Sequence, residues 1–261
     1  SPTASAFSSI AFGLSGSGKS TITLTSHGDR YPVKVLHDDA FVIDRQTGAT
    51  TALEPAYFDK TQDYPMSDPN TRYFLTVQNV GVTLDDHGKK TLVTQDIRNG
   101  NGRTVKSRYV TPNRVDHLVE SVDAIFWIMK DDALPPVVKV EDPSLAAAFG
   151  ATLATKRSTA ENVRADVDRE QLVIEPFANP FRSYPLGEDY QDFYDLFQQR
   201  GMACYILNTG FFQGQKVKPS DTLDAIAAIV DGTAAFKPFG PLPTMRYLSL
   251  PNFAVDFSNS A

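Results

Sequence analysis

The sequence has little cysteine, no long apolar run and no excess of positive charge. Cys204 is the one cysteine among 261 residues, which excludes a disulfide framework and a cysteine-rich zinc site and favours a reducing, cytoplasmic setting. No apolar run approaches the roughly 20 residues that span a bilayer, so we expect no membrane partner. The formal net charge of −6 offers no basic surface for a nucleic-acid partner.

The composition is that of a globular protein. Hydrophobic residues make up 41% of the chain, which is enough for a core, and 261 residues suit one large domain or slightly more. The sequence shows no internal repeat and no low-complexity tract. Function must therefore be argued from local motifs.

The strongest motif is "GLSGSGKST" at residues 13–21, which fits the pattern GxxxxGKS with Gly13, Gly18, Lys19 and Ser20. It lies between an apolar strand-like run at 8–14 and a helix-like run that begins in 16–24. Glycines let backbone N–H groups approach a phosphate, a lysine in this place bridges the β- and γ-phosphates, and the serine hydroxyl binds magnesium. The motif predicts nucleotide binding but does not by itself name a reaction.

Two carboxylates follow the next strand-like run, at 31–44. Asp38 and Asp39 are adjacent, so in an extended chain their side chains point to opposite sides. One of them can then face a magnesium ion held by the phosphate loop. The alternative is a solvated turn, where pairs of aspartates are common.

The remaining pattern predicts a mixed α/β domain and not a clean doubly wound sheet. Apolar alternation predicts strands within 72–86, and Asn-Gly pairs in "RNGNGR" predict a hairpin that joins 91–97 to 104–110. Further along we expect buried strands at 122–130 and 203–210 and helices at 143–157, at 189–201 ended by Gly201, and at 220–232 opened by a serine or aspartate cap.

Six segments occur in an order that points to one family: "FGLSGSGKST", "HDDAF", "LEPAYFDKT", "SRYVTP", "ALPPVVKV" and "CYILNTG". Over residues 8–257 the chain resembles the C-terminal, nucleotide-binding half of ATP-dependent phosphoenolpyruvate carboxykinase. The resemblance implies a P-loop mixed-sheet domain at 1–240 and an extended C-terminal tail at 241–261. The family's N-terminal, substrate-binding half has no counterpart here, so we expect an excised domain or a divergent relative cut from a longer protein.

The resemblance also implies roles for single residues. Glu54 and Lys60 keep the six-residue spacing of a Glu and a Lys near the phosphates, Arg108 matches the arginine that reaches the γ-phosphate, and Arg157 lies roughly where the family contacts adenine. Lys19, Lys60 and Arg108 would be the catalytic residues. The implied cofactor-binding residues of the loop are Gly13, Ser15, Gly16, Ser17, Gly18, Lys19, Ser20 and Thr21. The implied metal ligands are Ser20, Asp38 and Asp39, with magnesium at the nucleotide and manganese in particular at Asp39.

Simpler interpretations of these residues remain open. Glu54 and Asn208 can each cap a turn, and Lys60 can be a solvated surface lysine. Arg108 can be one charge of a basic cluster at a hairpin edge, together with Arg98, Arg103 and Lys106. The sequence also departs from the family after the aspartate pair, where "AFVID" replaces an acidic residue followed by "HGW".

The implied function is Mg-ATP binding in an enzyme that converts oxaloacetate and ATP into phosphoenolpyruvate, ADP and CO₂. Oxaloacetate or phosphoenolpyruvate would bind through the absent N-terminal half, so we expect little or no turnover from this chain alone. Two alternatives remain at this point. One is the nucleotide-binding core of a different kinase on the same scaffold, similar to the kinase of the sugar-transport carrier HPr; the other is a non-catalytic, regulatory ATP-binding module.

Overall fold

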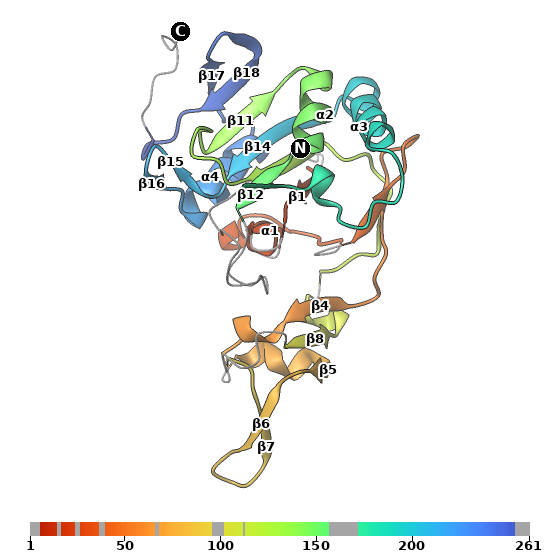
Figure 1. The fold of residues 1–261 in the computed structure, drawn as a ribbon, viewed down its shortest axis with the longest axis vertical. Coiled ribbons are helices and arrows are strands. Elements are labelled where there is room, and N and C mark those ends of the chain that lie inside the picture. Colours follow the sequence, from red (N-terminus) through yellow and green to blue (C-terminus); the bar gives the residue numbers. More distant parts are fainter. Residues whose placement is uncertain are drawn as a thin grey trace, which may run out of the picture.

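The main body of the protein is built around a six-stranded sheet (Figure 1). The computed structural model describes residues 6–14, 17–23, 27–36, 40–65, 68–95, 102–111, 113–156 and 172–253. The strand order of this sheet is β1-β10-β14-β11-β18-β17. Its strands are β1 (Ser9–Phe12), β10 (Ala124–Met129), β11 (Val137–Val140), β14 (Ala203–Asn208), β17 (Phe236–Phe239) and β18 (Leu242–Leu248).

Three neighbouring strands of the sheet, β1, β10 and β14, are parallel. All six residues of β10, "AIFWIM", are buried, because helices cover both faces of the sheet and leave no solvated side. Trp127 at the centre pairs with Phe12 of β1 and with Ile206 of β14. The buried strands expected within 122–130 and 203–210 are therefore confirmed. The strand expected within 8–14 is also present as β1, but only Ile10 of its four residues is buried.

The other half of the sheet is antiparallel. β11 runs antiparallel to β14, β18 antiparallel to β11, and β17 antiparallel to β18. Residues 242–248, which we expected within an extended C-terminal tail, thus form a strand with a neighbour on each side. Residues 254–261 of that tail lie outside the described residues. The mixture of parallel and antiparallel pairs agrees with the expected mixed α/β class.

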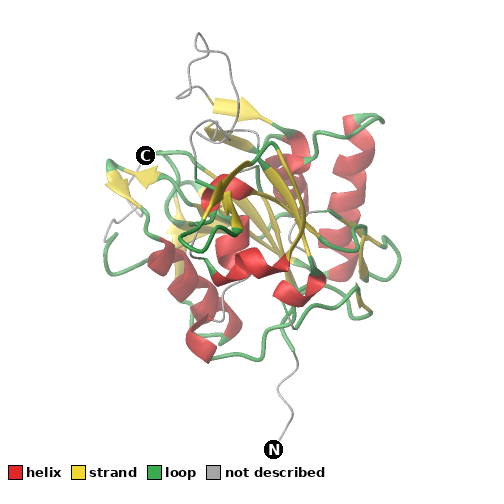
Figure 2. Cartoon of the chain, turned by 90° about the horizontal axis from the view of Figure 1, so that it is seen from below, coloured by secondary structure: helices red, strands yellow, loops and turns green. Residues whose placement is uncertain are grey.

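Helices cover both faces of the sheet (Figure 2). On one face, α2 (Pro143–Ala151) and α3 (Leu186–Arg200) pack on a core that contains Trp127; on the other, α4 (Pro219–Val230) packs on Phe126 and Leu207. α3 ends at Gly201, whose φ of 65° is the left-handed conformation expected of a glycine stop. Of the helices within the described ranges, none has the length and apolar character that a membrane span requires.

The expected cap of the last helix was wrong. α4 begins after Lys218, which has extended backbone geometry, and not after a serine or aspartate. The acidic residue acts three positions further on, where the Asp221 carboxylate accepts a hydrogen bond from the Lys218 backbone N–H at 2.9 Å. This contact satisfies a backbone donor at the helix start from inside the first turn.

The strands between residues 41 and 118 form small sheets, and those from β4 to β8 (residues 57–106) lie outside the main body (Figure 1). One contains β2 (Phe41–Ile43), β3 (Thr50–Ala52) and β9 (His117–Leu118), and a second contains β4 (Tyr57–Lys60), β8 (Arg103–Lys106) and β5 (Phe74–Gln78). β6 (Gly81–Leu84) and β7 (Lys90–Val93) form a hairpin beyond the second sheet. The remaining short elements are α1 (Lys19–Thr23), β12 (Ala154–Lys156), β13 (Leu172–Ile174), β15 (Phe211–Phe212) and β16 (Gln215–Lys216).

The predicted pairing around "RNGNGR" was wrong. β7 pairs with β6, whereas β8 lies between β4 and β5. The turn that forms is the one at residues 85–89, which joins β6 to β7. The Asp85 carboxylate accepts hydrogen bonds from the N–H groups of His87 and Lys89, both at 2.9 Å, and Gly88 takes a φ of 72°. Asp and Gly in these places close a tight hairpin locally, which costs less chain entropy than a longer loop.

The strand expected in 31–44 is only partly present. Val35 makes a single parallel bridge to Arg114, and the regular strand comes later, at Phe41–Ile43. The aspartate pair between these two segments lies outside the described residues.

Gly150 tests the packing of α2 on the sheet. A Cβ at this position would lie 2.6 Å from a ring carbon of Phe177 and 2.7 Å from a ring carbon of Trp127, both of them buried. We expect Gly150→Ala to lower the free energy of unfolding by about 1–3 kcal/mol because the core has no room for the methyl group. Urea denaturation measures this change.

Gly187 is the matched control, because it also lies in a helix and an added Cβ would have nothing within 4 Å. Gly187→Ala should leave the stability unchanged or raise it by up to about 1 kcal/mol through helix propensity. Equal losses in the two variants would contradict the packing described for α2.

Candidate nucleotide site

The candidate phosphate loop begins where β1 ends. Gly13 directly follows β1, and a Cβ there would lie 3.0 Å from the Cβ of Ile128 and would also collide with the Ser17 hydroxyl. Close packing between β1 and β10 therefore favours glycine at this position, since a side chain would force Ser17 or Ile128 to shift. The loop folds back on itself, since the Ser17 N–H donates to the Leu14 carbonyl at 3.0 Å.

Gly18 and Lys19 connect the loop to α1. Gly18 has a φ of 105°, which a residue with a side chain rarely adopts, and its carbonyl accepts the Ile22 N–H at 3.1 Å. The Lys19 ammonium group donates to the Gly13 carbonyl at 2.8 Å and to the Leu14 carbonyl at 3.4 Å. The predicted phosphate lysine thus lies over the loop that carries it.

The loop is attached to the end of β14 by a threonine that the sequence analysis did not single out. The Thr209 hydroxyl donates to the Ser17 carbonyl at 2.8 Å, and the Thr209 N–H donates to the Met129 carbonyl at 3.0 Å. Thr209 therefore fixes the loop relative to β10 and β14. Ser17 itself is 2% exposed, and its hydroxyl has no hydrogen-bond partner among the described residues.

Asn208 is the last residue of β14 and is fully buried. Its side-chain amide donates to the carbonyls of Asp131 and Leu134, both at 2.7 Å, and of Phe211 at 2.9 Å, while its oxygen accepts the Gly210 N–H at 2.9 Å. The turn-capping interpretation of Asn208 is therefore correct. Asn208 also stabilises a second segment, because the carbonyls of Asp131 and Leu134 belong to the loop that leads to β11.

A half-buried cation, missed in the sequence, lies at the same edge. Lys130 follows β10 directly, and its Cβ would be 3.2 Å from a Cβ placed on Gly210. Burial, and secondarily the positive charge of Lys216, lower the pKa of Lys130 below its ordinary value. The sequence signal for Lys130 is its position directly after an apolar strand, which predicts a lysine at the edge of the sheet.

Two of the predicted phosphate-site residues, Glu54 and Arg108, are connected through two residues that we did not predict, Asp116 and Arg114. Arg108 lies in a 3₁₀ turn, and its Nη2 is 3.2 Å from Asp116 Oδ2. The other oxygen of Asp116 is 3.1 Å from Arg114 Nε, and Arg114 Nη2 donates to the backbone carbonyl of Glu54. Arg114 thus connects the segments that carry Glu54 and Arg108.

Lys60 ends β4 and pairs across the sheet with Arg103 of β8. Its neighbour Asp59 has a different environment: the Asp59 carboxylate accepts from Lys106 Nζ at 2.8 Å, from the Tyr64 hydroxyl and, at 2.8 Å, from the Lys60 backbone N–H. Lys106 was expected in a basic cluster at a hairpin edge. It is instead 4% exposed and ion-paired, so that expectation was wrong for Lys106.

Several predicted site residues cannot be placed. Ser15, Gly16, Asp38, Asp39 and Arg157 lie outside the described residues. Ser20 and Thr21 lie in α1, where Thr21 is exposed. Within the described ranges, no group of three or more His, Cys, Asp or Glu side chains could hold a metal ion. Because both predicted carboxylate ligands lie outside those ranges, the metal site stays a prediction.

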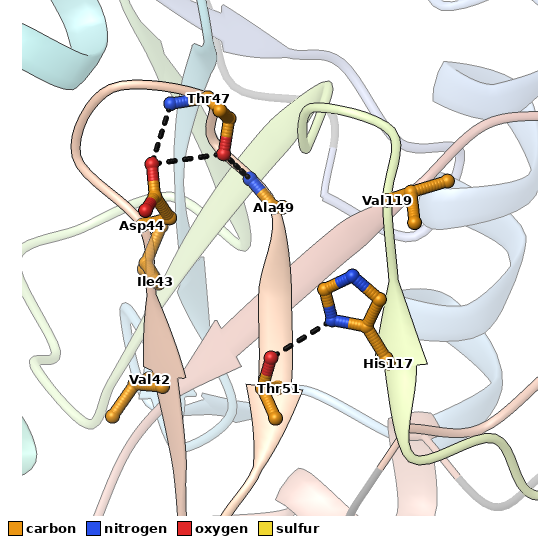
Figure 3. Close-up of a pocket in the computed structure, with 8 residues that line it drawn as sticks. All are labelled: Val42, Ile43, Asp44, Thr47, Ala49, Thr51, His117 and Val119. Carbon is orange, nitrogen blue, oxygen red and sulfur yellow. Dashed lines mark hydrogen bonds between the residues drawn. The ribbon is translucent and has the colours of Figure 1, made fainter.

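A separate hollow of about 590 Å³ lies on the sheet of β2, β3 and β9 (Figure 3). His117 Nδ1 and the Thr51 hydroxyl are 2.8 Å apart in it, and Val42 and Val119 are exposed beside them. No predicted site residue lines this hollow, so it is not part of the candidate nucleotide site.

The fold and the loop together define a mixed α/β protein with a candidate phosphate loop at the carboxyl edge of three parallel strands. The chain matches the family Phosphoenolpyruvate carboxykinase over residues 3–253 and belongs to it, in its ATP-dependent branch. A curated relative from Aeropyrum pernix, phosphoenolpyruvate carboxykinase (ATP), is 25% identical over 235 residues, which are 87% of this chain and 46% of the relative. The chain thus spans about half the length of that relative, and the predicted family resemblance is confirmed.

A substitution of Asn208 tests the hydrogen bonds at the end of β14, next to the residue that holds the candidate phosphate loop. We expect Asn208→Asp to destabilise the fold by about 3 kcal/mol or more at neutral pH, because a carboxylate would replace an amide that donates to three carbonyls. Burial and the carbonyls would raise the folded-state pKa of the new carboxyl group. A protonated carboxyl group has one donor in place of the amide's two, so part of the deficit remains near pH 4. The deficit should grow further as the pH rises above the unfolded value of about 3.9.

Urea denaturation of the wild type and the variant between pH 4 and 7 measures this deficit. The exposed Asn70 provides a control with the same change of charge, and Asn70→Asp should stay within about 0.5 kcal/mol throughout. A deficit of Asn208→Asp that does not depend on pH would contradict the assigned hydrogen bonds.

Proposed function

We propose that this chain binds Mg-ATP as the nucleotide-binding part of a phosphoenolpyruvate carboxykinase-like enzyme. The observation that carries the proposal is the loop of Gly13, Gly18 and Lys19 in a chain that matches this family over residues 3–253. Packing favours glycine at position 13 and backbone conformation favours it at position 18, and the lysine ammonium lies over the loop. These features suit a cradle in which backbone N–H groups and one cation hold phosphates.

The proposed phosphate cradle consists of Ser15, Gly16, Ser17, Gly18, Lys19, Ser20 and Thr21, and Lys19 would contact the β- and γ-phosphates. Arg108 would neutralise charge on the phosphoryl group as it moves, since a fixed guanidinium presents several donors in one plane. Glu54 and Lys60 would act beside it. Arg157 is proposed for the adenine side.

The proposed metal ligands are chemically suited to magnesium. Asp38, Asp39 and the Ser20 hydroxyl offer hard oxygen donors, which magnesium and manganese prefer over nitrogen and sulfur. When bound, the metal would offset negative charge on the phosphate oxygens. Asp39 is the residue we assign to manganese, by the family resemblance.

In the enzyme as a whole, the proposed reaction converts oxaloacetate and ATP into phosphoenolpyruvate, ADP and CO₂. Of the residues assigned in this chain, all act on the side of the phosphate donor. Because the chain spans about half of the relative's length, nucleotide binding and turnover are separate questions, and we expect the chain alone to bind nucleotide with little or no turnover. The family match favours this reaction over a protein kinase on the same scaffold.

Lys19 provides the direct test of nucleotide binding. Millimolar Mg-ATP should raise the melting temperature of the wild-type chain by mass action, since it binds the folded state. Lys19→Ala should weaken binding roughly tenfold or more through loss of a charged donor, and calorimetric titration measures the affinity.

The control is Lys237→Ala, which removes an exposed lysine of β17. It should bind Mg-ATP as the wild type does. If Mg-ATP leaves the melting temperature of the wild type unchanged, the proposed function is wrong.

The aspartate pair can be tested by the metal dependence of the same binding. We expect Asp39→Asn to lose most of the gain in ATP affinity that the wild type shows when Mn²⁺ or Mg²⁺ is added, because an amide is a weaker ligand than a carboxylate. Asp86→Asn, in the exposed turn between β6 and β7, provides a control of equal charge. An unchanged metal dependence in Asp39→Asn would refute the assigned ligand.

A further inference from the structure

We propose that Arg114 is a positioning residue that sets Arg108 at the γ-phosphate and holds the segment of Glu54 beside it. The inference rests on the proposed function, because it concerns how the phosphate-donor side is built. Arg114 precedes β9 and is not one of the residues for which sequence or resemblance predicted a role.

The first observation is that two polar contacts of the Arg114 side chain lead, directly or through Asp116, to the segments of Glu54 and Arg108. Arg114 Nε lies 3.1 Å from Asp116 Oδ1, and Arg114 Nη2 donates to the Glu54 carbonyl. The second oxygen of the same Asp116 lies 3.2 Å from Arg108 Nη2. The Arg114 backbone adds a bridge to Val35, three residues before the predicted metal ligand Asp38.

The second observation is the difference in burial along this chain of charges. The Arg114 side chain is 1% exposed, whereas those of Asp116 and Arg108 are 54% and 48% exposed. Of these three charged side chains, Arg114 is therefore the buried one, and Arg108 is accessible to a ligand. An exposed ion pair orders its partners weakly, and a buried anchor for the shared carboxylate reduces the freedom that Arg108 would otherwise have.

The third observation concerns Tyr57, a ring that is 1% exposed. The Arg114 guanidinium lies 5.0 Å from the centre of this ring, and Lys106 Nζ lies 5.8 Å from it. Lys106 in turn holds Asp59, whose carboxylate accepts the Lys60 backbone N–H. One buried ring thus contacts both cations. Lys106 is linked through Asp59 to Lys60, and Arg114 is linked to the Glu54 carbonyl and, through Asp116, to Arg108.

Stability alone is a poor reason for this arrangement. Arg114 Nη1 is buried and has no hydrogen-bond partner among the described residues, and a buried donor without a partner costs free energy. Apolar side chains of similar volume are often as stable as buried ion pairs or more so. The guanidinium is better explained by its geometry, because only a planar fork reaches Asp116, the Glu54 carbonyl and the Tyr57 face together.

The test uses two substitutions that conserve charge, so that a change in the overall field cannot explain the result. Arg114→Lys keeps the cation but loses the fork, and Asp116→Glu moves the carboxylate by one methylene group. The preference of the 261-residue chain for Mg-ATP over Mg-ADP measures contact with the γ-phosphate. We expect this preference to fall roughly threefold in each variant, the size expected for losing one such ion pair, and to fall further in Arg108→Ala.

The decisive arm repeats both substitutions in the Arg108→Ala background. If Arg114 and Asp116 act through Arg108, neither substitution should lower the preference further there. Arg45 and Asp192 form a similar ion pair at 2.8 Å elsewhere, so Arg45→Lys and Asp192→Glu should leave the preference unchanged. Melting temperatures identify a variant that is merely unfolded; if Arg114→Lys does not fold, Asp116→Glu, on a half-exposed residue, decides the outcome.

The outcomes separate the two proposals. An unchanged preference in a folded Asp116→Glu variant, or equal further losses in the Arg108→Ala background, would overturn the role of Arg114 and leave nucleotide binding intact. A wild-type chain that binds neither nucleotide would overturn the proposed function and this inference with it.

Discussion

The parallel pairing of β1, β10 and β14 is the constraint on which the candidate site depends. It brings the carboxyl ends of three strands to one edge, where Gly13 follows β1, Lys130 follows β10 and Thr209 follows β14. Carboxyl edges of parallel strands are where α/β proteins commonly bind ligands. Thr209 then holds the loop through the Ser17 carbonyl, so the loop's shape depends on contacts between segments far apart in the sequence.

A second set of constraints shapes the small sheets. Arg114 and Lys106 are buried cations on one tyrosine ring, and each is tied to a carboxylate beside a predicted phosphate residue. Buried charges are tolerated when they are paired and hydrogen-bonded. In Figure 1, α1 lies at the side of the main body that faces β4 and β8. The candidate site therefore has two parts, a loop at the edge of the large sheet and a group of cations in and beside the small sheets.

Local pattern predicted well those elements whose stability is local or fully buried. The apolar runs of β10 and β14 predicted strands correctly because burial on both faces of the sheet leaves a continuous apolar signature. The helical spacing of apolar residues predicted α3 correctly because that helix buries one side. Strand partners were not predictable in the same way: β8 lies between β4 and β5, and its local Asn-Gly signal suggested a hairpin with β7. Arg114 and Thr209 were missed because their contacts exist only once distant segments meet.

In the site that we propose, Lys19 at the start of α1 and Arg108 in the 3₁₀ turn after β8 hold one triphosphate. A crystal structure of the chain with magnesium and a non-hydrolysable ATP analogue tests it most directly. We predict that the Lys19 ammonium and the Arg108 guanidinium both contact phosphate oxygens of the same molecule, with Arg114 still bound to Asp116. A triphosphate that contacts Lys19 alone, or that binds away from residues 13–21, would contradict it.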